Sequence, residues 1–189
     1  MNSKLNLLAM SGLILLFGTV ANAAENHSSF KVLFGSKSLD TDWGKDDSMD
    51  TIGFQATYQP AALPFGIALD FYGSGNESNV SGNTTDTTIG EINLGLRYQP
   101  TMSTGAFAPY IGAGVSYVAS ELQEYSSGTK KSYEDNGTGY WVGGGIDYLF
   151  AQQWSIGFDA RYSSADVELN AETRNAGGFG WVASIGYHF

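Results

Sequence analysis

Residues 179–189 read Phe-Gly-Trp-Val-Ala-Ser-Ile-Gly-Tyr-His-Phe, and this stretch decides the fold. Every second residue from Phe179 to Phe189 is apolar or aromatic, whereas the residues between them are mostly small or polar. A period of two places the apolar side chains on one face of a β-strand and does not fit the period of a helix. Residues 154–162 alternate in the same way. The chain is therefore predicted to end in two β-strands that each have one apolar face.

The same alternation recurs upstream in six further segments, of which the first is the least regular. These segments are residues 30–39, 52–58, 65–71, 92–98, 109–117 and 140–150. The links between successive segments alternate in length. Short links fall near residues 60–64, 100–106 and 151–153, and long polar links span about 40–50, 73–86, 119–137 and 164–178. This order predicts an all-β protein, an up-and-down, eight-stranded antiparallel transmembrane β-barrel with short periplasmic turns and long external loops.

A water-soluble sandwich or a lipocalin-like barrel could also have strands with one apolar face. In such a protein the opposite faces would meet water and would be rich in lysine, glutamate, threonine and serine. Here they are rich in glycine and carry few charges, which suits a narrow interior. The mean hydropathy of −0.14 with 14% aromatic residues fits a barrel wall, in which only every second residue faces lipid. Aromatic residues also gather near the strand ends, as interfacial girdles do.

The N-terminus has the pattern of an export signal. Lys4 precedes an apolar stretch over residues 5–17, and Ala21-Asn22-Ala23 follows as a cleavage site. The stretch falls short of the roughly 20 apolar residues of a membrane-spanning helix. We therefore expect a cleaved signal peptide at residues 1–23 and one barrel domain at residues 24–189, exported through the periplasm to the outer membrane. The chain has no cysteine, so no disulfide stabilises it.

Charged residues at inward-facing positions of the predicted strands form the main candidate site. They are Lys31, Asp70, Glu91, Arg97, Asp147, Asp159 and Arg161, with Lys37 near the outer rim. Because buried ions are costly unless they are paired, and an eight-stranded barrel is about filled by its side chains, we interpret them as an ionic network that plugs the lumen. The alternative is that the same groups line a thin conducting or gated path.

The long links contain most of the remaining charge and are strongly acidic. A formal net charge of −10 makes binding of nucleic acid through a basic patch improbable. Acidic clusters such as Asp40, Asp42, Asp46 and Asp47 suggest an external cationic ligand or divalent cations that bridge to lipopolysaccharide. Their spacing matches no defined calcium loop, so we assign no metal, and we expect no cofactor.

A catalytic role is not expected. The chain has two histidines, His27 and His188, and Ser184 lies on the same strand face as His188. Four residues of strand separate this pair by roughly 13 Å at about 3.3 Å per residue, which is too far for a nucleophile and its base. A serine from another strand would be needed.

With these residues in view, the sequence resembles the small eight-stranded outer-membrane barrel proteins, which include the OmpA transmembrane domain, the opacity proteins and the OmpW family. The resemblance is carried by residues 109–115, 145–148, 154–162 and 186–189. It implies that Ile185, Tyr187 and Phe189 form the signal read by the outer-membrane assembly machinery. We expect the barrel to be a monomer surrounded by outer-membrane lipids and lipopolysaccharide.

The resemblance leaves the role open among three classes. One is a structural or porin-like membrane protein with a narrow, charge-plugged lumen and acidic loops. The second is an OmpW-like conduit for small hydrophobic molecules, and the third is an opacity-type adhesin. A lipid-modifying enzyme is a remote fourth.

Overall fold

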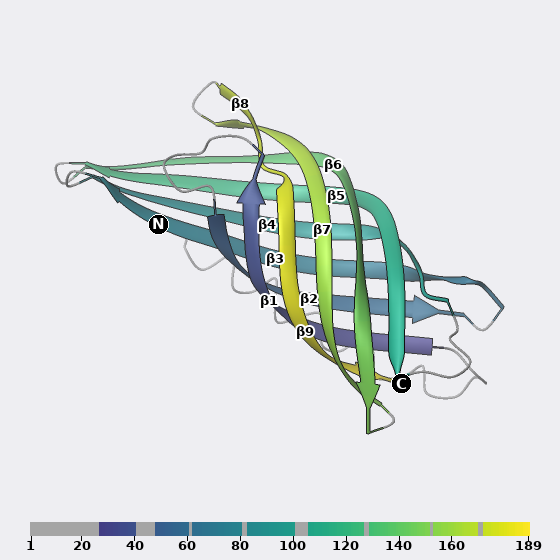
Figure 1. Cartoon of the computed structure of the whole chain (residues 1–189). Helices are drawn as coiled ribbons and strands as arrows, with labels where there is room; N and C mark the ends of the chain where they lie inside the picture. The colour runs from purple at the N-terminus through teal and green to yellow at the C-terminus, as the bar shows by residue number, and fades with distance from the viewer. Residues whose placement is uncertain are drawn as a thin grey trace.

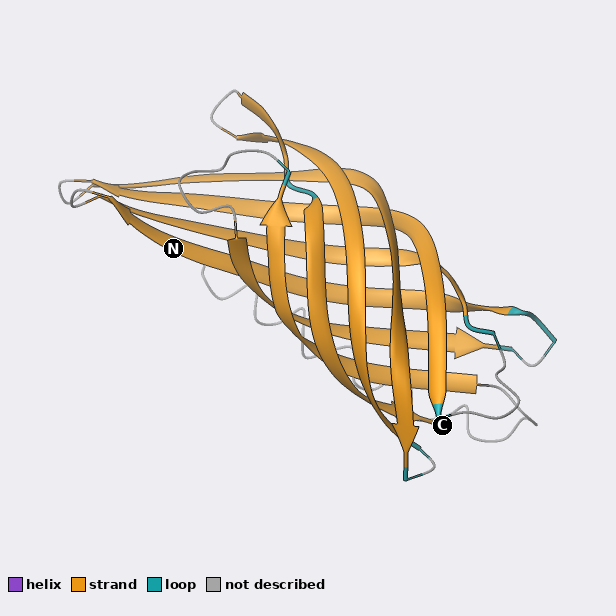
Figure 2. Ribbon diagram, viewed as in Figure 1, coloured by secondary structure: helices purple, strands orange, loops and turns teal. Residues whose placement is uncertain are grey.

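A computed structural model describes residues 27–40, 48–60, 62–80, 83–100, 106–126, 129–151, 153–169 and 172–189. The expected signal peptide lies outside these residues. Figure 2 shows that the described part of the chain consists almost entirely of strands, with short loop segments at some of their ends. No helix among the described residues is long and apolar enough to cross a membrane.

Eight strands form a closed antiparallel barrel, and a ninth is a short external addition (Figure 1). The strands are β1 (His27–Leu39), β2 (Ser48–Gln59), β3 (Phe65–Val80), β4 (Asn83–Tyr98), β5 (Phe107–Ser126), β6 (Thr129–Phe150), β7 (Trp154–Leu169), β8 (Glu172–Asn175) and β9 (Gly178–His188). Each barrel strand pairs with its neighbour in chain order, apart from β8, and β9 pairs with both β7 and β1 to close the ring. Closure leaves the backbone of the wall without an unpaired edge, which is what a sheet in lipid requires. The predicted eight-stranded barrel is confirmed.

The closing seam shows how the alternation in residues 179–189 determines the orientation of the wall. Tyr187 of β9 lies opposite Phe30 of β1 on one side and Trp154 of β7 on the other. The ring centroids of Tyr187 and Trp154 are 5.2 Å apart in an edge-on arrangement. These side chains point away from the lumen, whereas Val182 and Ser184 of the same strand are buried inside.

The outward face carries the apolar surface that lipid must cover. Side chains such as Ile111, Val115, Leu94 and Ile156 are half or more exposed, while their inward-facing neighbours are buried or are glycines. An apolar outer band of this kind is stable only in a bilayer, because in water it would form a continuous apolar surface.

Two of the expected external loops are instead strands, and a third, residues 164–178, contains the end of β7 and all of β8. β3 and β4 pair as far as Val80 and Asn83, and β5 and β6 pair as far as Ser126 and Thr129. The prediction of polar loops at residues 73–86 and 119–137 was therefore wrong. These segments lack apolar alternation, but they contain Thr84, Thr85, Tyr125 and Tyr133, whose residue types favour strands. Each segment also contains a Ser-Gly dipeptide, Ser81-Gly82 or Ser127-Gly128, of the kind that favours tight turns.

We call the outer part of this sheet the arm, and define it as residues 76–80, 83–88, 119–126 and 129–138 of β3–β6. Figure 1 shows these four strands running on together well beyond the ends of β1 and β9. Acidic residues assigned to loops therefore lie on strands of the arm, among them Glu77, Asp86, Glu121 and Glu134. Of the acidic cluster at residues 40–47, only Asp40 is described, and Asp42, Asp46 and Asp47 lie outside the described residues.

Candidate functional site

The lumen contains charged side chains in two layers, and the lower layer lies toward the short turns. Lys31 Nζ of β1 contacts Asp147 of β6, with 2.6 Å to Oδ2. Arg97 Nη2 of β4 lies 2.9 Å from Asp70 Oδ2 of β3. The Tyr110 ring lies close to both cations, 4.2 Å from Lys31 Nζ and 4.9 Å from Arg97 Cζ. All five side chains are buried, so the two ion pairs and the ring fill the barrel at this level.

Asp159 of β7 belongs to the same part of the lumen but has no ion pair with another described residue. Its side chain is buried, and Gly145 of β6 lies directly opposite it in the ladder. A Cβ atom at Gly145 would collide with Asp159 and would lie 2.8 Å from the Tyr110 hydroxyl oxygen. Glycine is therefore required at this point by the close approach of the interior side chains.

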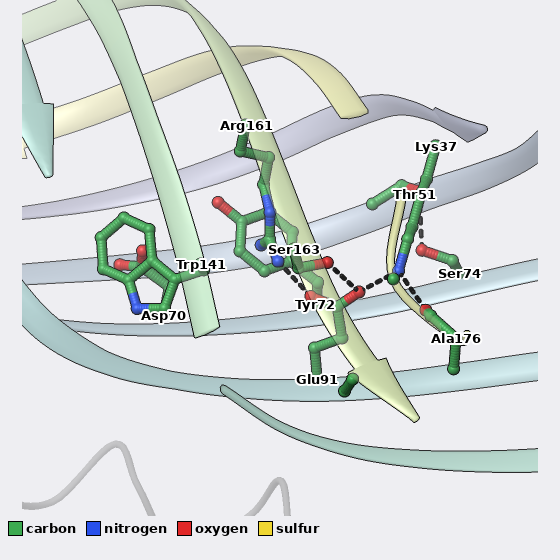
Figure 3. Close-up of polar contacts among 12 residues, drawn as sticks. Lys37, Thr51, Asp70, Tyr72, Ser74, Glu91, Trp141, Arg161, Ser163 and Ala176 are labelled. Carbon is green, nitrogen blue, oxygen red and sulfur yellow. Dashed lines mark hydrogen bonds and ion pairs between the residues drawn. The ribbon is translucent and has the colours of Figure 1, made fainter. Parts of the chain in front are cut away.

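The upper layer is centred on Glu91 of β4, which accepts hydrogen bonds from both Lys37 of β1 and Arg161 of β7 (Figure 3). The guanidinium carbon of Arg161 lies 3.6 Å from the centroid of the Tyr72 ring. Lys37 Nζ also donates to the carbonyl oxygen of Ala176, at 2.7 Å. The Glu91 carboxylate thus links β4 to β1 and β7 across the lumen. Through Lys37, the segment between β8 and β9 that contains Ala176 is linked as well.

Hydroxyl groups complete the upper layer, and little space remains. Thr51 and Ser74 are joined by a hydrogen bond of 2.8 Å between their side-chain oxygens. A cavity beside Lys37 and Arg161 has a volume of about 10 Å³, which is about the space of one water molecule. Together the two layers hold four cationic and four anionic side chains, so their formal charges cancel.

An apolar cluster closes the lumen above the upper layer, and sequence reasoning missed it. Its members are Leu39, Met49, Ile89, Val118, Leu122, Ala165, Val167 and Ala176, with Tyr133 packed against them. We call it the apolar cap. The signal was present in the sequence, since Leu39 follows Lys37 and Ile89 precedes Glu91 by two positions, which keeps each pair on the same strand face.

At the lower end of the lumen, a serine from a neighbouring strand lies close to His188, whereas Ser184 on the same strand as His188 is too far away. Ser155 Oγ of β7 lies 3.0 Å from His188 Nε2 of β9, within hydrogen-bond distance. Ser155 is only 1% exposed, however, so its hydroxyl is enclosed by the barrel. A nucleophile needs a substrate within reach as well as a base.

The three residues implied as the assembly signal all lie at the end of the chain. Ile185 and Tyr187 are on the lipid-facing side of β9, and Phe189 follows the strand with 64% of its surface exposed. The backbone N–H of Phe189 donates to the carbonyl oxygen of Ser28, at 2.8 Å, which fixes the last residue against the start of β1.

Comparison with known proteins places the whole described chain in one class of barrel. Residues 9–189 match the family model described as outer membrane protein beta-barrel domain. An uncharacterized outer-membrane protein of Sinorhizobium fredii, y4mB, is 33% identical over 79 residues, which cover 42% of this chain and 34% of that protein. The matched segment thus spans about a third of that relative's length.

Solved structures resemble the barrel over most of its length. OprG of Pseudomonas aeruginosa has a TM-score of 0.69 at 19% identity, covering 87% of this chain and 96% of its own. Neisserial surface protein A has a TM-score of 0.65 at 17% identity, covering 87% and 97%. Ail, the attachment invasion locus protein of Yersinia pestis, has a TM-score of 0.60 at 17% identity, covering 87% and 99%. At these identities the likeness concerns the fold.

Proposed function

This chain belongs to the outer membrane protein beta-barrel domain family, and from that premise we propose that it is a closed barrel that displays the arm at the cell surface and does not conduct. Its place is the outer membrane. Within that membrane the barrel acts as an anchor, and the external sheet is the part that meets other molecules.

The filled lumen is the observation that carries this proposal. Two buried ion pairs with Tyr110 occupy the lower layer, and the Lys37–Glu91–Arg161 triad occupies the upper layer. The apolar cap lies above both. An ion that crossed the barrel would have to separate these paired charges. The cavity beside Lys37 and Arg161 offers room for about one water molecule.

Conductance of the refolded protein in a planar bilayer tests the proposal. We expect no channel steps from a barrel whose closure has been verified by heat-modifiable migration on a gel. Glu91→Gln and Arg97→Ala should show whether the network blocks a path, and Ser132→Ala in the arm serves as the control. Discrete, salt-dependent steps from the wild-type protein would overturn the closed lumen.

A conduit for small apolar molecules is the second candidate, and the apolar cap is the observation that favours it. The cap gives the outer end of the lumen an apolar lining, with Val118 and Ile89 fully buried within it. Uptake of an apolar dye into lipid vesicles that contain the refolded protein, abolished by Val118→Asp and unchanged by Ser132→Asp, would support this candidate. Equal dye uptake with and without protein would end it.

We also propose that the Ser155–His188 pair is structural. Its serine is enclosed by the wall, and the hydrogen bond ties β7 to β9 near the seam. Hydrolysis of an activated ester by the folded barrel that disappears in Ser155→Ala would contradict this role.

A further inference from the structure

The outer edge of β6 is an open sheet edge. Within the described residues, β7 pairs with β6 only from Gly139 inward and then pairs with β8 instead. From Thr129 to Thr138, β6 therefore has β5 as its only ladder partner among the described strands. The side chain of Asp135 accepts a hydrogen bond from the backbone N–H of Glu168, which leaves residues 130–134 as the accessible part of the edge.

This edge has an ordered charge pattern. It reads Lys130-Lys131-Ser132-Tyr133-Glu134, with both of the arm's basic residues near the tip and an acidic residue toward the barrel. Lys130, Ser132 and Glu134 are exposed and lie on the same face of the strand. Neither Lys130 nor Glu134 forms an ion pair with another described residue. Lys130 Nζ lies 5.4 Å from the centroid of the Tyr125 ring on β5. Both of these side chains are exposed, so a partner can still reach the charge of Lys130 as well as that of Glu134.

The arm also contains a repulsion that its own residues leave in place. Glu121 of β5 lies directly opposite Glu134 of β6. Like charges directly across a ladder are destabilising. Glu121 is a hydrogen-bond acceptor for Gln123 and for Ser132, the latter at 3.2 Å. A cation placed on the open side of Glu134 would relieve the repulsion.

We propose that this edge pairs with the same edge of a second copy of this chain. An antiparallel ladder with Ser132 on the two-fold axis places Lys130 opposite Glu134 of the second copy, and Glu134 opposite Lys130 of the second copy. Directly opposite residues share a face of the sheet, so both charge pairs form on one side. Lys131 then lies opposite Tyr133 of the second copy on the other side.

Two neighbouring registers are less favourable. Centring the ladder on Lys131 sets Lys131 against itself, and centring it on Tyr133 leaves Lys130 opposite Asn136, with Glu134 opposite Ser132. Lysines on an exposed edge ordinarily discourage pairing. In the ladder centred on Ser132, Lys130 of each copy instead pairs with Glu134 of the other copy, so these two residues select one partner and one register.

The strand directions determine where the second copy is. An antiparallel edge contact reverses the direction of β6, and with it the direction of the attached barrel. Copies inserted in one membrane all point the same way, so the partner lies in a facing membrane. Ser132 is eight residues beyond Tyr140 of the outer aromatic girdle, roughly 26 Å along the strand at about 3.3 Å per residue.

A single contact between two arms is expected to be weak, but many such contacts together should hold two facing membranes. A ladder of five residues is short, but many copies on two facing surfaces act together, and multivalency raises the overall affinity by orders of magnitude. Exposed charge pairs are screened by salt, so clustering should decrease as the ionic strength rises. This inference deepens the display role proposed above and rests on the outward placement of the arm.

Clustering of phospholipid vesicles tests the contact. Protein is refolded into preformed phosphatidylcholine vesicles at high density, folding is verified by heat-modifiable migration, and light scattering is followed at low and high salt. Wild-type vesicles should cluster at low salt. Lys130→Glu alone and Glu134→Lys alone should each reduce scattering to the level of protein-free vesicles, because each sets like charges opposite each other.

Mixing the two single variants gives the decisive result. In the mixture, both contacts become complementary again, so clustering should return, and it should also return in the double variant Lys130→Glu/Glu134→Lys. Both variants keep a negative net charge, which excludes simple attraction between oppositely charged vesicles. Glu77→Lys on β3 is the matched control with the same charge change away from the edge, and it should cluster as the wild type does.

Two results would overturn the inference: wild-type vesicles that stay dispersed, or a mixture of the single variants that stays dispersed. Conductance measured on the same samples separates this test from the previous one. If the protein neither conducts nor clusters vesicles, the closed lumen is supported and the self-pairing is ruled out. If the protein conducts and also clusters vesicles, the closed lumen is ruled out and the self-pairing is supported.

Discussion

The lumen and the arm are built from the same strands, β3–β6, yet they treat charge in opposite ways. Inside the barrel, Glu91 is 3% exposed and accepts hydrogen bonds from two cations. In the arm, Glu134 is exposed, has no ion pair with a described residue and lies opposite Glu121. The difference follows from the surroundings. A charge surrounded by the barrel is costly unless it is paired, as Glu91 is, whereas a charge in water can remain unpaired at little cost. Asp159, which is buried without an ion pair to a described residue, is the exception in the lumen.

The apolar residues show the same contrast. In the membrane-spanning part they point outward to lipid, as Ile156 and Leu94 do. At the outer end of the lumen they point inward, where Leu122 joins the apolar cap and Tyr133 packs against it. The strand alternation continues without a break, but the residue types exchange faces where the solvent on the outer face changes from lipid to water.

Breaking a buried pair should have the largest effect on this contrast. Arg97→Ala leaves the carboxylate of Asp70 buried without its partner, and we expect the free energy of unfolding to fall by about 3 to 5 kcal/mol. Lys131→Ala in the arm should change it by less than about 0.5 kcal/mol. Urea unfolding in lipid vesicles measures both, and equal losses would contradict the assignment of the two regions.

Placing a charge on the lipid-facing side should have a somewhat smaller effect. Ile156→Arg is expected to lower the free energy of unfolding by about 2 to 4 kcal/mol if the position is near the bilayer midplane. Ser132→Arg, on an exposed side chain of the arm, should be almost neutral. The same refolding measurement checks both variants. Tolerance of arginine at residue 156 would mean that this face of β7 does not meet lipid.

The sequence predicted the wall because the alternation around Tyr187 and Ile156 repeats in every barrel strand. It also predicted which charges face inward, since parity along a strand places them there. It could not predict that Glu91 pairs with Lys37 and Arg161, because these contacts cross the lumen and depend on the stagger of strands that are not neighbours in the ladder.

The arm was missed for a different reason. Residues such as Thr85 and Thr87 favour strands, but apolar residues on the inward face of these segments are sparse, so no regular alternation marks them. Their pairing partners decide the structure, as in the long hairpin that joins Leu122 to Tyr133. Polar strands of this kind look like loops in a sequence until the ladder beside them is known.

Stability of Glu91→Gln beside that of Glu134→Gln tests the central claim most directly. Both changes replace a carboxylate on a strand of the same sheet with an amide of similar shape. If paired interior charge holds the barrel together, Glu91→Gln should lower the free energy of unfolding by about 3 kcal/mol or more, since it leaves Lys37 and Arg161 buried without a counter-ion. Glu134→Gln should change it by less than about 0.5 kcal/mol. Equal and small effects from the two variants would contradict the account.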